Sequence, residues 1–145
     1  MGRYVSPDVR REVAARAELL CEYCLIAEED TFFGCEVEHI ISLKHGGSSA
    51  PDNLAYACAF CNRHKGSDVG SVSQAGEFKR FFNPRTDSWS EHFRLVANVI
   101  QPVTAIGEVT ARVLRFNHTD QLLERARLIS VGRYPHKAAL VRMQS

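Results

Sequence analysis

The sequence has no apolar run near the length of about 18 residues that a membrane-spanning helix needs. The start of the chain, Met1 to Pro7, also lacks the apolar core of a secretory signal peptide. These absences predict a cytoplasmic protein with no membrane partner. Internal repeats and low-complexity segments are missing too, so repeat architectures are not expected. At 145 residues and 45% apolar composition, the chain is expected to form a single domain spanning residues 1–145.

The sequence also has little net charge, only +1, which by itself gives no indication of a nucleic-acid partner. The charge is unevenly distributed, however. Residues 1–77 carry 7 Lys and Arg against 12 Asp and Glu, whereas residues 78–145 carry 11 against 5. If the protein binds a phosphate backbone, most of the cationic surface must come from the second half. An ordinary solvated surface of mixed charge is the alternative.

Cysteine is scarce, yet four of the five cysteines form two Cys-x2-Cys pairs: Cys21 with Cys24, and Cys58 with Cys61. In a reducing compartment such pairs hold metal more often than they form disulfides. A two-residue gap lets both sulfurs point at one ion, and structural Zn²⁺ takes four such ligands tetrahedrally. The pairs therefore predict a structural zinc, with a redox pair as the alternative. Cys35 is left over and is expected to be a small buried hydrophobe.

The segment between the two pairs is longer than the roughly 15–20 residues of common zinc ribbons, so a sizeable unit is inserted there. It contains Glu38 followed by His39, a Gly46-Gly47 loop, and Asn53 before an apolar strand. Phosphodiester hydrolysis needs an activated water and charge relief on the phosphate. Because histidine has an ordinary pKa of about 6.5, His39 suits proton abstraction near neutrality. An ordinary surface or core histidine is the alternative.

On these residues, the stretch CEVEHIISLKHGGSSAPDNLAYACAFCNRHKG (35–66) resembles the HNH endonuclease family. The resemblance implies an α+β fold: a ββα-metal (HNH) nuclease core with a four-cysteine zinc knuckle at residues 6–66. A basic C-terminal extension of a hairpin and helices, residues 67–145, is expected to pack on this core. The extension, which includes FFNPRTDSWSEHF, also resembles the downstream part of one bacterial group of HNH proteins. DNA guidance, a homodimer interface and fold support are all open roles for it.

The resemblance also implies an activity and roles for single residues. The activity is metal-dependent hydrolysis of DNA phosphodiester bonds, leaving 5′-phosphate and 3′-hydroxyl ends. His39 would be the general base and Glu38 a ligand of a catalytic Mg²⁺ or Mn²⁺, although many relatives have Asp at that position. Asn53 would brace the loop and orient the base. An ordinary turn residue is the alternative for Asn53.

A short helix is expected from Ala59 to Lys65, ended by Gly66. The family often places a metal-facing His or Asn just after the last cysteine, and here that residue is Asn62. At about 100° per residue, His64 lies about 200° from Asn62, so the two cannot both face the ion. Asn62 is therefore the expected ligand and His64 the reserve candidate.

Three side chains are expected to contact DNA phosphates. Lys65 shares a helix face with Asn62 at i, i+3. Lys44 and His45 lie in the flexible glycine loop, where ordinary loop polarity is an equally good explanation. The alternative function, from a different class, is a zinc-knuckle module that binds nucleic acid without cleaving it. A zinc domain for protein interaction is a third hypothesis.

The remaining elements are expected from local signals. Ser6-Pro7-Asp8 is typical of a helix start. Two strands, 92–96 and 99–103, are expected to pair through Ala97-Asn98, and Thr104 is expected to cap a helix. A last helix is expected from about Thr119 to Ser130. The aromatic residues between these signals are expected to be core residues rather than base-stacking platforms: Phe78, Phe81, Phe82, Trp89 and Phe93.

Overall fold

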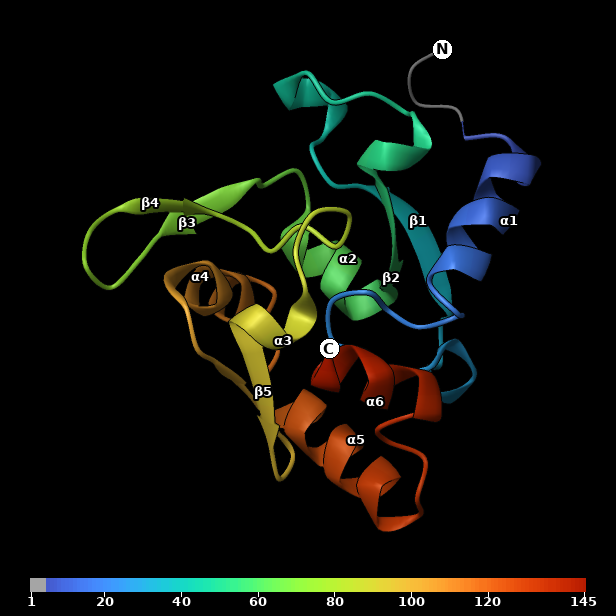
Figure 1. Cartoon of the computed structure of the whole chain (residues 1–145), viewed down its shortest axis with the longest axis vertical. Helices are drawn as coiled ribbons and strands as arrows, with labels where there is room; N and C mark the ends of the chain where they lie inside the picture. The colour runs from blue at the N-terminus through green and yellow to red at the C-terminus, as the bar shows by residue number, and fades with distance from the viewer. Residues whose placement is uncertain (1–4) are drawn as a thin grey trace.

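The computed structural model describes residues 5–145 of the chain (Figure 1). Residues 1–4, on which part of the signal-peptide expectation rests, lie outside the described residues. Helices and strands are mixed, which confirms the α+β class. Within residues 5–145, no helix is both long and apolar enough to cross a membrane. The helices and strands in chain order are α1 (Pro7–Arg16), β1 (Cys35–His39), β2 (Leu54–Cys58), α2 (Ala59–Lys65), β3 (Gly70–Val72), β4 (Phe78–Arg80), α3 (Trp89–His92), β5 (Phe93–Val96), β6 (Val99–Pro102), α4 (Ala105–Val113), α5 (Thr119–Ser130) and α6 (Lys137–Gln144).

The centre of the first half is an antiparallel pair, β1 and β2, followed directly by α2 (Figure 1). The register sets Glu38 opposite Ala55 and His39 opposite Leu54, so His39 is the last residue of its strand. All five residues of β2 are buried, which explains why that strand reads as a continuous apolar run. As expected, α2 runs from Ala59 to Lys65 and has Gly66 as its C-cap.

Helix α1 covers the outer side of this pair. It begins as expected, because the Ser6 hydroxyl accepts a hydrogen bond from the Val9 N–H at 3.2 Å and Pro7 is the first helical residue. Val13 and Ala17 face inward and form a small second core with Leu54 from β2. The helix ends at Arg16, so a separate turn, rather than the helix itself, leads the chain to the first zinc-pair cysteine.

The extension contains the expected hairpin and helices. Strands β5 and β6 pair with Val96 opposite Val99, and the Thr104 hydroxyl accepts a hydrogen bond from the Gly107 N–H at 3.0 Å at the start of α4. Helix α5 has the predicted bounds. Three elements were not predicted: the β3–β4 hairpin, the short helix α3, and α6, whose exposed Leu140 and Val141 obscure its amphipathic pattern. Because α3 includes His92, strand β5 begins at Phe93, one residue later than expected.

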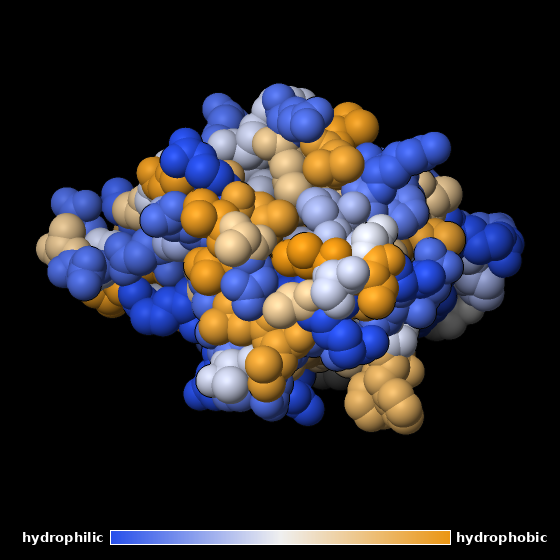
Figure 2. Space-filling view, turned by 90° about the horizontal axis from the view of Figure 1, so that it is seen from below, coloured by the Kyte–Doolittle hydropathy of each residue, from blue (hydrophilic) through white to orange (hydrophobic). Residues whose placement is uncertain are grey.

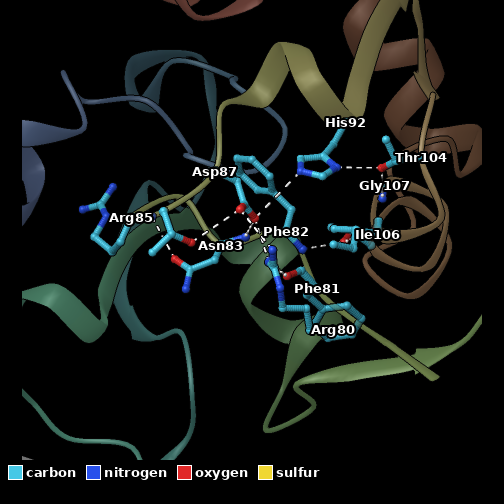
Figure 3. A network of polar contacts seen from close by, with 12 residues as sticks. Arg80, Phe81, Phe82, Asn83, Arg85, Asp87, His92, Thr104, Ile106 and Gly107 are labelled. Carbon is cyan, nitrogen blue, oxygen red and sulfur yellow. Dashed lines mark hydrogen bonds and ion pairs between the residues drawn. The ribbon is translucent and has the colours of Figure 1, made fainter.

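The expected aromatic core is present, with one exception. Phe81, Phe82, Trp89 and Phe93 are buried, but Phe78 on β4 is 62% exposed. Close to these rings, Asp87 closes the turn after β4 (Figure 3). Its carboxylate accepts two hydrogen bonds from Arg80, at 2.7 and 3.1 Å, and one from the Asn83 N–H at 2.9 Å. These bonds hold the turn that carries Arg85 toward the first half of the chain.

The two halves share one hydrophobic cluster, which runs from Leu20 to Ala139. The extension also binds the backbone of the first cysteine turn. The Trp89 indole donates to the Tyr23 carbonyl at 2.8 Å, and the Tyr134 hydroxyl donates to the Cys24 carbonyl at 2.8 Å. Buried Glu22, from the same turn, forms ion pairs with Arg85 and Arg142. Helices and loops far apart in sequence therefore close around a single turn.

The face seen from below Figure 1 mixes apolar side chains near its centre with hydrophilic ones along its edge (Figure 2). Large apolar residues remain exposed on the last two helices and between them: Leu123, Ile129, Val131, Leu140 and Val141. Scattered exposure of this kind is normal for protein surfaces.

Replacing Tyr134 with Phe tests the contact between the extension and the cysteine turn. The variant keeps the ring but leaves the Cys24 carbonyl without its buried donor, so the free energy of unfolding should fall by about 1–3 kcal/mol. Urea unfolding of the zinc-loaded protein, followed by circular dichroism, measures this. An unchanged midpoint would contradict the structural importance of the bond.

Candidate functional site

The four paired cysteines lie together in the interior. The Sγ atoms of Cys21, Cys24, Cys58 and Cys61 all lie within 4.8 Å of one another, and all four residues are buried. A tetrahedron with Zn–S bonds of about 2.3 Å has sulfur–sulfur edges of about 3.8 Å. The Sγ atoms of Cys24 and Cys58 are 3.8 Å apart, and the Cys61 N–H donates to the Cys58 sulfur at 3.4 Å. The cluster therefore has the donor set and the spacing to hold zinc.

Cys35 lies outside this cluster, as expected, on the first residue of β1. It is partly buried and packs against both hydrophobic clusters. Burial raises the pKa of the Cys35 thiol, so it stays protonated at neutral pH. It provides a natural control for the zinc ligands.

Glu38 is not exposed to solvent at the end of β1. It is 5% exposed, and its carboxylate lies 3.3 Å from the Lys65 ammonium and accepts a hydrogen bond from the Tyr23 hydroxyl at 3.3 Å. Burial raises the pKa of Glu38 to about 7, against the opposing effects of Lys65 and Tyr23. The carboxylate is thus fixed in position, and its charge is balanced from inside the protein.

Lys65 differs most from the sequence expectation. Its side chain is 2% exposed, and its ammonium donates to the carbonyls of His39 and Ile40, at 3.1 and 2.9 Å, besides pairing with Glu38. All three ammonium hydrogens therefore have acceptors within the protein, and none is left for an external phosphate. The i, i+3 relation to Asn62 suggested a surface position. The i, i+4 relation to buried Cys61 was the better signal, because it places Lys65 on the inner face.

His39 is the last residue of β1. Neighbouring side chains within a strand point to opposite faces, but here, where the strand ends, His39 and Glu38 border the same hollow. The His39 Nε2 is 2.9 Å from the Ser49 hydroxyl, a partner that sequence reasoning missed because the loop brings it back from ten residues away. Burial and the nearby Lys65 charge lower the pKa of His39 from its ordinary value. The imidazole is therefore neutral at pH 7. When Nε2–H donates to Ser49, Nδ1 keeps a lone pair that can accept a proton.

Asn53 forms hydrogen bonds across the loop between the strands. Its side-chain amide donates to the carbonyls of Ile41 and Ser48 at 2.9 and 2.7 Å, and its oxygen accepts from the Ile41 N–H at 3.0 Å. The loop is tight at Gly47, where an added Cβ would lie 1.8 Å from the Ile41 carbonyl oxygen. Gly46 has a φ of +88°, which glycine adopts without strain. This packing fixes the segment next to His39.

Glu38, His39, Lys44 and Asn62 all line one hollow of about 500 Å³. His45 is exposed in the same short 3₁₀ turn as Lys44 but does not line the hollow. His64 points elsewhere: its Nδ1 is 2.9 Å from the Phe60 carbonyl and its ring packs on the Phe60 ring at 4.3 Å. The angular separation of these two residues on α2 thus brings Asn62 to the hollow and turns His64 away from it.

The comparison with known families agrees with this geometry. Residues 21–68 match the family model described as HNH endonuclease. The resemblance is confirmed. These residues, called the HNH segment from here on, contain both cysteine pairs, the hollow and α2. The match indicates nuclease activity in general and a nucleic-acid substrate. No curated protein and no solved structure shows a significant match.

Exchange of the zinc ligands tests the cluster. Replacing Cys58 with Ser should abolish bound zinc and unfold both halves of the chain, because structural zinc contributes on the order of 10–16 kcal/mol and the halves share one core. Metal analysis and far-UV circular dichroism measure the two effects. Cys35→Ser is the matched control and should retain one zinc per chain. Retention of zinc by Cys58→Ser would contradict the four-thiol site.

Replacing Lys65 with Met tests the internal ammonium. The variant leaves Glu38 buried without its cation and two carbonyls without donors, so stability should fall by about 3–5 kcal/mol. Urea unfolding at pH 7.5 measures the loss. Arg63→Met, an exposed change two residues away on the same helix, should alter stability by less than about 0.5 kcal/mol. Equal losses for the two variants would contradict an internal role for Lys65.

Proposed function

We propose that the protein is a metal-dependent endonuclease that hydrolyses DNA phosphodiester bonds. The observation that carries this proposal is the position of His39: within the HNH segment, a neutral imidazole oriented by Ser49 opens onto the hollow lined by Asn62 and Lys44. A positioned base whose pKa lies somewhat below neutrality is suited to taking a proton from water at physiological pH. The zinc cluster is closed by four thiols and therefore serves the fold.

Each residue around the hollow has a separate role in this proposal. His39 accepts the proton of the attacking water. Asn53 and the glycine loop hold the strand end so that the imidazole stays in place, and Lys44 provides a positive charge toward the phosphate. Glu38 and Asn62 would hold a divalent Mg²⁺ or Mn²⁺ ion, which relieves charge on the phosphate and the leaving oxygen. DNA, rather than RNA, as the substrate is part of the proposal.

The donor set for the divalent ion consists of hard oxygen atoms, as Mg²⁺ requires. The Asn62 side chain has no hydrogen-bond partner among the described residues, and its amide oxygen is available at the hollow. Glu38 also lines the hollow, although its carboxylate is paired with Lys65. Besides the four cysteines, residues 5–145 contain no group of three or more His, Cys, Asp or Glu side chains gathered at one point. A divalent site here would therefore depend on these two residues, the phosphate and water.

A non-cleaving nucleic-acid-binding module is the second candidate, and one observation favours it. The charge of Glu38 is already balanced by an ammonium 3.3 Å away, so a divalent ion would have to compete with Lys65. Under this alternative the protein binds DNA with the same surface but needs no second metal. Cleavage and metal dependence separate the two candidates.

Replacing His39 with Ala should reduce cleavage by about 10²- to 10⁴-fold, because the general base is lost. Nicking of a supercoiled plasmid by zinc-loaded protein, with Mg²⁺ or Mn²⁺ added or withheld, measures the rate. His64→Ala at saturating DNA is the control and should retain the rate, since His64 faces Phe60. Full activity in His39→Ala would contradict the role of His39 as the general base. DNA binding without cleavage under either ion would support the non-cleaving module.

The pH dependence of wild-type nicking should follow the neutral form of His39. Because the pKa of His39 lies below about 6.5, the contribution of His39 should be constant above that pH and fall tenfold per pH unit well below it. Glu38, whose pKa is about 7, would add a further loss of rate below about pH 7 because only its carboxylate form holds the ion. Single-turnover rates from about pH 5 to 8.5 measure the profile. A midpoint above pH 7 would show that another group limits the rate.

A further inference from the structure

Most Lys and Arg side chains already form ion pairs or hydrogen bonds within the protein. In the described part of the chain, nearly every Lys and Arg forms an ion pair or donates to a carbonyl, as Arg80 does to Asp87 and Arg125 to the Asn98 and Phe116 carbonyls. Within residues 5–145, five Lys and Arg side chains have neither kind of partner, and all five are exposed: Lys44, Arg63, Arg94, Arg115 and Lys137. These five are the cations free to bind an external anion without breaking an existing interaction.

Three of the five, Lys44, Arg63 and Arg115, lie along one continuous surface. Lys44 lines the His39 hollow together with Asn62, and Arg63 follows Asn62 on the outer side of α2. At about 100° per residue, Arg63 lies between Asn62 and Phe60 on the exposed arc of the helix, opposite the inner arc of Cys61 and Lys65. The surface therefore continues from the hollow over Arg63 to Phe60.

Beyond Phe60, two histidines continue the surface into the extension. The Phe60 ring packs on His64 at 4.3 Å and lies 6.2 Å from His118, which precedes α5. His118 Nδ1 accepts a hydrogen bond from the Asp120 N–H, so in the neutral ring its Nε2 carries the other hydrogen and is a donor. His118 can thus present a donor nitrogen to a ligand next to an aromatic ring, whereas the Nδ1–H of His64 is already donated to the Phe60 carbonyl.

Arg115 marks the far end of this surface. Together with His118 it lines a second hollow of about 390 Å³, in which the other arginine, Arg112, is occupied by Glu108 at 2.6 Å. Arg115 has a φ of +57°, a conformation in which glycine would be unstrained. The guanidinium at this position has no acid partner among residues 5–145, so its charge is directed to the exterior.

We propose that a phosphate backbone extends from the His39 hollow across α2 to the end of α4, with Arg63 and Arg115 as its phosphate contacts. This surface, defined by Arg63, His64, Arg115 and His118, is called the α2–α4 track. It rests on the proposed function, because the ligand is the same DNA that enters the hollow. It also gives the extension a role, because Arg115 adds positive charge beside the acidic first half.

The two other free cations provide a matched control. Lys137 starts α6 and lines a pocket with Glu29 and Asp30, and Arg94 lies on β5, so neither belongs to the track. The double variants Arg63→Gln/Arg115→Gln and Arg94→Gln/Lys137→Gln remove the same charge from exposed positions. Both are made in the His39→Ala background, so that DNA is bound without being cut.

Binding of a fluorescent DNA duplex, followed by anisotropy over a series of NaCl concentrations, tests the track. The Arg63→Gln/Arg115→Gln variant should bind about 10-fold or more weakly at about 0.1 M salt, and the slope of log K against log salt should fall by about 2. The control pair should change the affinity by less than about 2-fold. Equal weakening by both pairs, or no weakening by the track pair, would overturn the proposal.

Plasmid nicking by the same double variants with His39 intact separates failure of the track from failure of the proposed function. If wild-type protein cleaves and the track variant binds and cleaves like wild type at all salt concentrations, the track is wrong while the nuclease assignment holds. If the parent protein binds no DNA at any salt concentration, both proposals are overturned. Reduced affinity with an unchanged rate at saturating DNA is the result expected for the track.

Discussion

The structure depends on one crowded point, where four sulfur atoms lie within 4.8 Å of one another in the interior. Four thiolates cannot be buried together without a cation, because each would carry an unbalanced charge. A zinc ion bound by the four sulfurs would resolve this conflict and would join the turn before β1 to the start of α2. Once that link exists, α2 lies at a fixed distance from the end of β1, which is what allows Lys65 to reach the carbonyls of His39 and Ile40.

The candidate active site is therefore supported from two directions. From inside, Lys65 fixes the backbone of His39 and the carboxylate of Glu38, and from outside Asn53 holds the loop that carries Ser49 to the imidazole. These supports are hydrogen bonds between short elements, and the one long side chain among them, that of Lys65, is buried and bonded to three acceptors. A site built in this way is preorganised, and little rearrangement is needed to align the base. The ion pair with Lys65 also explains why Glu38, although next to His39 in sequence, interacts with the protein interior.

Local signals predicted much of this fold but not the contacts that orient the site. The Ser6 cap, the hairpin turn, the Thr104 cap and helix 119–130 follow from short-range rules, and the structure has them. The two cysteine pairs likewise predicted a single cluster. Ser49 and Tyr23 were missed because nothing local pairs them with His39 and Glu38. Lys65 was placed outside because the helical face was judged from Asn62 alone, whereas only tertiary packing offers three buried acceptors for an ammonium.

The bond between the Tyr134 hydroxyl and the Cys24 carbonyl joins residues 110 positions apart and has a consequence for biosynthesis. While the ribosome is still making the last helices, the cysteine turns are already outside the exit tunnel, but the groups that cover them have not been translated. Domains generally form as the chain emerges, N-terminal part first. The nascent first half must therefore persist with its metal ligands partly uncovered. Early capture of zinc would protect these thiols from oxidation until the remaining helices close over them.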